Sequence, residues 1–446
     1  MKKIVLLLVV FITGHLLHAE EWTYSGEIYG GGGSKYSLKY DIDGEELKDS
    51  SFFGEGNLTL SANNGYWYTS LFSEITRDNF YQEMQAKLSC AIVDSDVGNY
   101  RVYTLYKNNN DITESDNDYA SISVYAEGMK YFNESTSLHI YSSYSGTTYK
   151  ERKNELFDYR TIAGSASLTY TDYNVRISSE KQQYDTGSLV PDFTTTSLVF
   201  STSFYKDTFV SSNSLTYEIK NYDFVTSDYR SYAKIVLSTR TGYRMSSATM
   251  LYLLGSLTQQ NEDADASGDG TNSLKKIGLE ASIFSYPLSF IVQYGRQDYR
   301  EVSTSADRLN KNIYSVDINW SYWTDRFTFF LSNVWELQKV EDIEATEYPE
   351  AKNSNYVDST VCSVEYEWSE SLRSAIDFSY EFKKHFLEDE MNANYFFYSV
   401  KKTFDYTLSF SYSLRAEATY SVSRYETFTE NDTKELGLKT MIRYYF

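Results

Sequence analysis

Histidine, the side chain that most often acts as a catalytic acid or base, is scarce in this sequence. Beyond residue 19 the chain holds two histidines, His139 and His385. A general base needs a partner that orients it, and His385 with Asp389 is the one candidate pair. His139 alternates with Leu138 and Ile140, which places it on the polar side of a strand. The sequence therefore predicts a protein without enzymatic activity.

An acidic segment in the second half of the chain spaces its carboxylates like the ligands of a hard cation. Asp263, Asp265 and Asp269 alternate with small residues, and Gly268 stands where a sharp turn is needed. This is similar to the first half of an EF-hand calcium loop, but the twelfth position is Leu274 rather than a bidentate glutamate. The pattern favours a solvated acidic loop over a calcium site. No haem-attachment motif or cluster of metal ligands is present, so no cofactor is predicted.

The two cysteines are not expected to form a disulfide bond. Cys90 and Cys362 lie far apart in the sequence, and each alternates with apolar neighbours. In an oxidising compartment a disulfide framework needs more cysteines at regular spacings. We expect both to be free thiols that behave as small hydrophobes.

Most of the chain alternates between apolar and polar residues with a period of two. From Leu408 to Val422 every second residue is apolar, and the residues between are Ser, Arg, Glu or Thr. The segment from Leu372 to Phe382 behaves in the same way. A helix would scatter these apolar residues around its whole surface, whereas a strand collects them on one face. The elements that position the charged side chains are therefore strands.

The first nineteen residues have the pattern of an export signal. Lys2 and Lys3 precede an apolar run from Ile4 to Ile12, and Ala19 offers a small residue before a cut. The run is shorter than the roughly 20 residues that a spanning helix needs. No cysteine follows the cut, so a lipid anchor is not expected. We predict a signal peptide over 1–19 and a short segment over 20–33 before the first strand.

The last residues form an alternating strand that ends on an aromatic side chain. Leu436, Leu438, Ile442, Tyr444 and Phe446 share one face of this strand. A chain with such an end and an export signal resembles the Gram-negative outer-membrane β-barrels, and within them a porin-like barrel of no specific subfamily. The resemblance implies Sec-type export to the bacterial outer membrane, with lipid and lipopolysaccharide as partners. It also implies that Ile442, Tyr444 and Phe446 belong to the signal read by the barrel insertion machinery.

Short turns alternate with longer polar loops, as in outer-membrane barrels. Ten such turns predict an all-β fold, a transmembrane antiparallel up-and-down β-barrel of about 22 strands, within a range of about 18 to 24. The barrel is expected over 34–446 and without a plug domain, because only a short segment precedes the first clear strand at Ser34. The expected turns lie near Asn64-Gly65, Asp96-Gly98, Asn133-Glu134, Asp172-Asn174, Lys206-Asp207, Thr241-Gly242, Tyr286-Pro287, Thr324-Asp325, Ser369-Glu370 and Asp405.

The charged residues of the polar face are expected to line the lumen. A charge on the lipid face costs about 2 to 4 kcal/mol at the bilayer midplane, so the alternation assigns charges to a solvated interior. Pairing between them as structural ladders is the alternative reading. The candidate lumen residues are Lys87, Arg101, Arg176, Glu218, Lys234, Glu280, Asp317, Glu365, Arg373, Asp377, Arg415, Glu417, Lys439 and Arg443, joined by Glu180, Lys220 and Arg240.

Composition agrees with a paired sheet and excludes one class of partner. The 446 residues include 44 Tyr and 26 Phe but only 3 Pro. Aromatic residues suit strands, and Pro cannot donate to a ladder. The net charge is -21, and loss of Lys2 and Lys3 with the signal leaves -23. Nucleic-acid binding needs a basic surface, so it is excluded as a function.

Three functions remain compatible with these patterns. The sequence favours a porin-like barrel that lets ions or small solutes diffuse through a polar lumen. The alternative is a structural sleeve around a partner such as a multihaem cytochrome. A soluble secreted β-protein is the third reading, and it would need to stay in solution without detergent. Trimers are common among porins, but no surface pattern identifies a homo-oligomer here.

Overall fold

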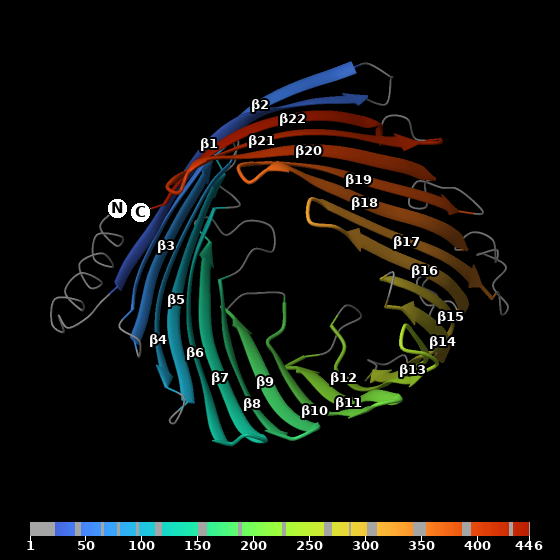
Figure 1. The fold of residues 1–446 in the computed structure, drawn as a ribbon. Coiled ribbons are helices and arrows are strands. Elements are labelled where there is room, and N and C mark those ends of the chain that lie inside the picture. Colours follow the sequence, from blue (N-terminus) through green and yellow to red (C-terminus); the bar gives the residue numbers. More distant parts are fainter. Residues whose placement is uncertain are drawn as a thin grey trace.

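The computed structural model is a single closed ring of strands (Figure 1). It describes residues 23–445, apart from the intervals 41–45, 64–66, 78–80, 95–97, 112–117, 150–157, 186–189, 225–228, 263–269, 285–286, 301–309, 342–353, 386–393 and 428–430. The expected export signal, Phe446, Asp389 and the acidic residues Asp263, Asp265 and Asp269 lie outside the described residues.

Twenty-two strands form the wall, which matches the number expected from the turns. The strands run from 11 to 18 residues. Their bounds are β1 Thr23–Tyr40, β2 Glu46–Asn63, β3 Trp67–Arg77, β4 Tyr81–Asp94, β5 Gly98–Asp111, β6 Tyr119–Asn133, β7 Thr136–Tyr149, β8 Tyr159–Tyr170, β9 Tyr173–Tyr184, β10 Phe193–Lys206, β11 Phe209–Tyr222, β12 Tyr232–Arg244, β13 Thr249–Glu262, β14 Gly270–Ile283, β15 Leu288–Arg300, β16 Lys311–Trp323, β17 Phe327–Val340, β18 Asn355–Ser369, β19 Leu372–His385, β20 Tyr395–Ser409, β21 Tyr412–Tyr425 and β22 Thr433–Tyr445.

Every strand pairs with its sequence neighbours in antiparallel fashion, and the last strand pairs with the first. The register of the closing pair places Leu438 opposite Ser34 and Tyr445 opposite Glu27. Blue β1 and red β22 lie side by side in Figure 1. The expected pairing of the last strand with the first is confirmed. Closure removes the two sheet edges, whose unpaired N–H and C=O groups could not be satisfied in lipid.

The wall has one apolar and one polar face. Register partners project from the same side of a sheet, and following the pairings through all 22 strands returns to the starting face. One face carries exposed large apolar side chains, as lipid contact requires. We call it the outward face; it includes Val102, Ile140, Ile177, Leu198, Leu253, Leu279, Trp320, Ile376 and Leu438.

The barrel begins earlier than the sequence suggests. We expected the first strand at Ser34, with 20–33 as a separate segment, but β1 already starts at Thr23. Its glycine run, Gly30 to Gly33, is paired on both sides, with β2 and with β22. A run of glycines reads as a flexible lead-in because Gly weakens strands. Here it belongs to the wall.

Two of the ten expected turns are misplaced. Thr241-Gly242 lies within β12, and the connection to β13 falls at 245–248. Asp405 lies within β20, and the turn to β21 is formed by Phe410 and Ser411. Both errors leave the strand number unchanged, because each hairpin keeps one turn.

The structure also bears on helical spans. Among the described residues, no helix is both long and apolar enough to cross a membrane.

Candidate functional site: the polar face of the barrel

All fourteen candidate lumen residues lie on the face opposite the outward one. Arg101 is adjacent to outward Val102 on β5, for example, and Glu280 to outward Leu279 on β14. The same holds for Glu180, Lys220 and Arg240, which the register places on the polar face. That this face is in contact with a continuous column of water stays a prediction.

Two ion pairs cross the seam where the barrel closes. Lys439 Nζ on β22 lies 2.6 Å from Glu55 Oε1 on β2, so the contact spans β1. Arg443 Nε lies 2.8 Å from Glu27 Oε1 on β1. The strand between Lys439 and Glu55 presents Gly31 and Gly33 to the polar face at these levels. The absence of side chains there leaves room for the lysine to reach across.

A second group of charges forms a ladder on β20 and β21. Arg415 donates from Nε to Asp405 Oδ1 at 2.5 Å and from Nη2 to Asp405 Oδ2 at 3.0 Å. Glu417 Oε1 lies 3.5 Å from Lys401 Nζ and 3.9 Å from Arg415 Nη1. Two cations and two carboxylates thus neutralise one another along the wall. In this group the charged residues pair with one another, which is the alternative that the sequence left open.

A third group lies on β12 to β14. Arg240 donates to both oxygens of Glu280, from Nε at 2.9 Å and from Nη2 at 2.7 Å. Its guanidinium carbon lies 3.5 Å from the centre of the Tyr252 ring. Only 8% of Glu280 is exposed, and Ser282 donates a further hydrogen bond to it. Bidentate pairing and ring stacking together fix the orientation of the guanidinium group.

The wall from β5 to β12 is rich in hydroxyl groups instead. The side chains of Ser178 and Ser197 share a 2.7 Å hydrogen bond across β9 and β10. Tyr103 and Tyr125 stack with ring centres 4.4 Å apart, and Lys87 Nζ lies 4.3 Å from the Tyr103 ring. Hydroxyl groups both donate and accept, so this wall can hold water or polar solutes without selecting a charge.

Several residues singled out from the sequence are not brought together into a site. His385 is 6% exposed at one end of β19. Cys90 and Cys362 are both free thiols, as expected, and both lie on the outward face. The described part of the chain contains no group of three or more His, Cys, Asp or Glu side chains able to hold a metal. The calcium candidates belong to an interval that is not described.

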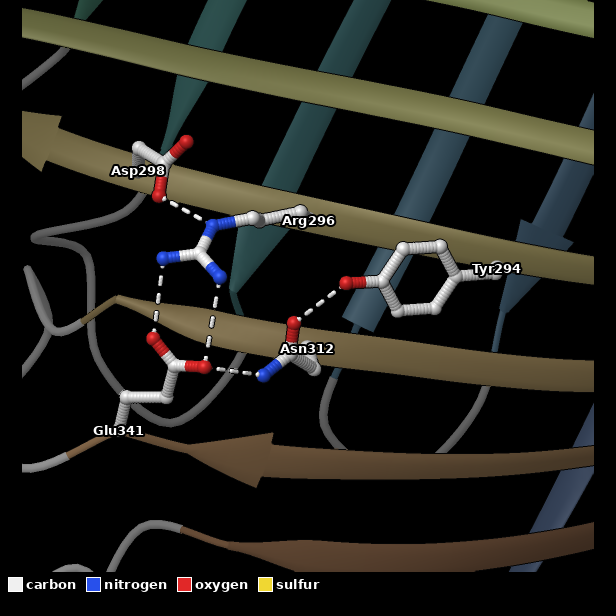
Figure 2. A network of polar contacts seen from close by, with 5 residues as sticks. All are labelled: Tyr294, Arg296, Asp298, Asn312 and Glu341. Atoms are coloured by element: carbon white, nitrogen blue, oxygen red, sulfur yellow. Dashed lines mark hydrogen bonds and ion pairs between the residues drawn. The ribbon is translucent and has the colours of Figure 1, made fainter.

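Sequence reasoning missed the polar groups that face outward. Lys402, in the middle of β20, is exposed on that face, where it approaches the Phe404 ring at 4.8 Å. Arg296, Asp298 and Glu341 also lie there, near the end of their strands (Figure 2). The alternation could have identified these residues. Every second residue of a strand faces the same side, so Arg296 and Asp298 share the outward face of β15 with Val292.

Comparison with solved structures shows the same architecture at very low sequence identity. The siderophore receptor PirA from Pseudomonas aeruginosa is 9% identical with a TM-score of 0.61, over 94% of this chain and 80% of that chain. The copper transporter OprC is 11% identical with a TM-score of 0.63, over 96% and 81%. The unliganded ferric citrate transporter FecA is 9% identical with a TM-score of 0.63, over 94% and 78%.

Comparison of the sequence with protein families and with curated proteins identifies no relative. No protein-family model matches the chain, and no curated protein matches it. Identity near 10% shows the fold and not the activity. The fold is that of a Gram-negative outer-membrane β-barrel, and the bacterial outer membrane is the location that this fold indicates.

Proposed function

We propose that the protein is a porin-like barrel through which small hydrophilic solutes and ions diffuse passively. The observation that carries the proposal is the composition of the polar face. Its charges pair across strands, as in the Arg415–Asp405 and Arg240–Glu280 contacts, and its hydroxyl wall includes the Ser178–Ser197 contact. A solvated interior tolerates such a surface, whereas a dry one would leave polar groups unsatisfied.

The length of chain between strands supports a passive route. Barrels of 22 strands enclose a wide lumen, and transporters of that size fill it with a plug. The longest interval between strands here runs from 341 to 354, after Val340 and before Asn355. Independently folded domains need about 50 residues or more. No interval between the described strands is therefore long enough to form a folded plug.

The similar solved structures include a siderophore receptor, a copper transporter and a ferric citrate transporter. By name, one of these proteins is a receptor and the other two are transporters. Such a role agrees with transport in the broad sense. The mixed-charge ladder and the hydroxyl wall favour diffusion of hydrophilic solutes over capture of one ligand, because the charges of the ladder already pair with one another.

Planar-bilayer recording tests the proposal. The folded protein, identified by its mobility on an unheated gel, is added to one side of a bilayer in about 1 M salt, where the Debye length is about 3 Å. Stepwise conductance of uniform size is expected. Neutral polymers of graded size should reduce each step until they become too large to enter. The proposal is wrong if folded protein inserts but produces no steps.

A further inference from the structure

Aromatic side chains line the polar face at one end of the strands from β6 to β12. Each of these strands begins or ends there with an aromatic residue, and the register places all of them on the polar face. Rings from neighbouring strands lie close together. The distances between ring centres are 6.0 Å for Tyr119 and Tyr149, 5.9 Å for Tyr159 and Tyr184, and 5.7 Å for Phe193 and Tyr222. We call this row of rings the aromatic arc.

The aromatic arc lies at the mouth of the barrel and is held by a repeated contact. With the short turns on the periplasmic side, the strand ends that carry the arc are extracellular. Three of its residues donate their backbone N–H to the side chain that precedes the next strand. These contacts are Tyr149 N to Asp158 Oδ1 at 2.8 Å, Tyr184 N to Asp192 Oδ1 at 2.7 Å and Tyr222 N to Ser231 Oγ at 3.0 Å. Each of these rings is thus presented from a fixed strand end.

An ammonium group of the protein itself lies on the aromatic arc. Lys220 Nζ on β11 is 4.0 Å from the centre of the Phe193 ring and 4.8 Å from the centre of the Tyr222 ring. A cation is attracted to a ring face within about 6 Å of its centre. Tyr229 adds a third ring, 5.7 Å from Tyr222 between centres, and all three rings are half-buried. This three-ring cluster therefore already accommodates one ammonium ion.

The charges around the three-ring cluster suit a cation. Glu218 lies on the same face of β11, two residues before Lys220, and accepts a hydrogen bond from the Tyr232 hydroxyl at 2.8 Å. Arg230, which follows the third ring in the chain, is compensated by Glu262, whose Oε2 lies 3.8 Å from Arg230 Nη1. The whole chain carries a net charge of -21. A protein field of that sign concentrates cations at its surface.

We propose that the three-ring cluster binds a small quaternary ammonium solute, which displaces the Lys220 side chain from the rings. The inference rests on the proposed function, because it names a class of solute that the mouth of the porin-like barrel retains. The lysine ammonium is strongly hydrated and sits on a flexible stem, so it can return to water. A quaternary ammonium has no N–H groups to hydrate, and aromatic cages are a general means of recognising it.

Binding is measured on the folded protein in a deuterated non-ionic detergent by saturation-transfer NMR, with choline as the probe. The comparison probe is the uncharged analogue of choline in which a tert-butyl group replaces the trimethylammonium group. The two probes have the same shape and differ in charge. Choline should bind about fivefold more tightly than the analogue, the factor that corresponds to about 1 kcal/mol from cation–π attraction.

Variants with matched controls locate the site. Lys220→Thr uncovers the rings and should tighten choline binding about fivefold. Lys234→Thr removes the same charge from the same face of the neighbouring strand without uncovering the rings, and should tighten binding less. Tyr222→Leu and Phe193→Leu should each weaken binding about fivefold. Tyr412→Leu, on the outward face of β21, should leave it unchanged. Folded mobility on an unheated gel is required of each variant, and either ring variant alone is sufficient.

Three results would overturn the inference. Equal binding of the uncharged analogue would mean that the rings take apolar solutes. Equal tightening by the Lys220 and Lys234 variants would mean that net charge alone attracts choline. Unchanged binding in the ring variants would place choline elsewhere.

Failure of the site and failure of the proposed function are distinguishable. Conductance steps from a barrel that does not bind choline overturn the inference and leave the porin-like function standing. Choline binding with the expected variant pattern, by a barrel that gives no conductance steps, supports the site and overturns the porin-like function.

Discussion

Lys439 and Glu55 form an ion pair across an intervening strand, with Nζ 2.6 Å from Oε1. Lys439 is on the last strand and Glu55 on the second, so the contact bridges β1 at the point where the ring closes. Both side chains are largely buried, at 25% and 17% exposure. The pair therefore joins the two ends of the chain by side chains as well as by the β1–β22 ladder.

Reversal of both charges tests this seam. Lys439→Glu leaves two carboxylates facing each other, and we expect it to lower the free energy of unfolding by about 1 to 3 kcal/mol. The double variant Lys439→Glu with Glu55→Lys should recover most of the loss, because the pair is restored in reverse. Urea unfolding in detergent micelles measures both. A double variant no more stable than the single one would show that the contact contributes nothing.

The glycines of β1 are expected to differ in tolerance. A Cβ on Gly31 would lie 2.7 Å from Thr440 O and 2.8 Å from Met441 Cγ, inside van der Waals contact. A Cβ on Gly30 would lie no nearer than 4.0 Å to any neighbour, Glu55 O. Gly31→Ala should reduce the fraction of barrel that migrates as folded on an unheated gel, and Gly30→Ala should not. Equal behaviour of the two variants contradicts the register of the closing strands.

A charge introduced on the outward face of β10 should destabilise the barrel more than a charge introduced on its polar face. Leu198 is 46% exposed on the outward face, and Leu198→Arg should cost about 2 to 4 kcal/mol in a bilayer. Ser197 is on the polar face with Glu218 as its register partner, so Ser197→Arg should change stability by about 1 kcal/mol or less. Unfolding in lipid vesicles gives both values. Greater damage from Ser197→Arg would reverse the assignment of faces.

Ion selectivity should follow the ladder on β20 and β21. Glu417 contacts both Lys401 and Arg415, so Glu417→Gln leaves the two cations under-compensated. Charged side chains along a pore bias which ions pass, and the variant should shift selectivity toward anions. The reversal potential in a salt gradient measures the shift. Thr419→Val, on the same face of β21, is the control and should leave the potential unchanged.

The strand number could be predicted from the sequence, because the alternation and the turn spacing depend only on local residue order. The exact turns could not. From Leu408 to Val422 the alternation continues through the two-residue turn at Phe410 and Ser411 without a change of phase. A turn of two residues preserves a period of two, so the pattern reads as one strand and conceals its own hairpin.

Gly242 shows a second reason why the turns could not all be predicted from the sequence. Glycine favours turns, which suggested one at this position. In the barrel Gly242 faces Tyr252, and a Cβ there would lie 2.5 Å from the tyrosine ring. The glycine is thus required by close packing between two strands. Contacts such as Lys439–Glu55 and Arg296–Glu341 were equally hidden, because they depend on register and join residues far apart in the sequence.

Cysteine labelling along β8 tests the central claim, a hydrated polar face inside an apolar outer one, most directly. With Cys90 and Cys362 replaced by serine, single cysteines are placed at Ser165 and Ser167 on the polar face and at Ala166 and Leu168 on the outward face. In lipid vesicles a small, charged, membrane-impermeant thiol reagent should modify the first two and spare the others. Modification of the outward pair, or of neither pair, would contradict the account.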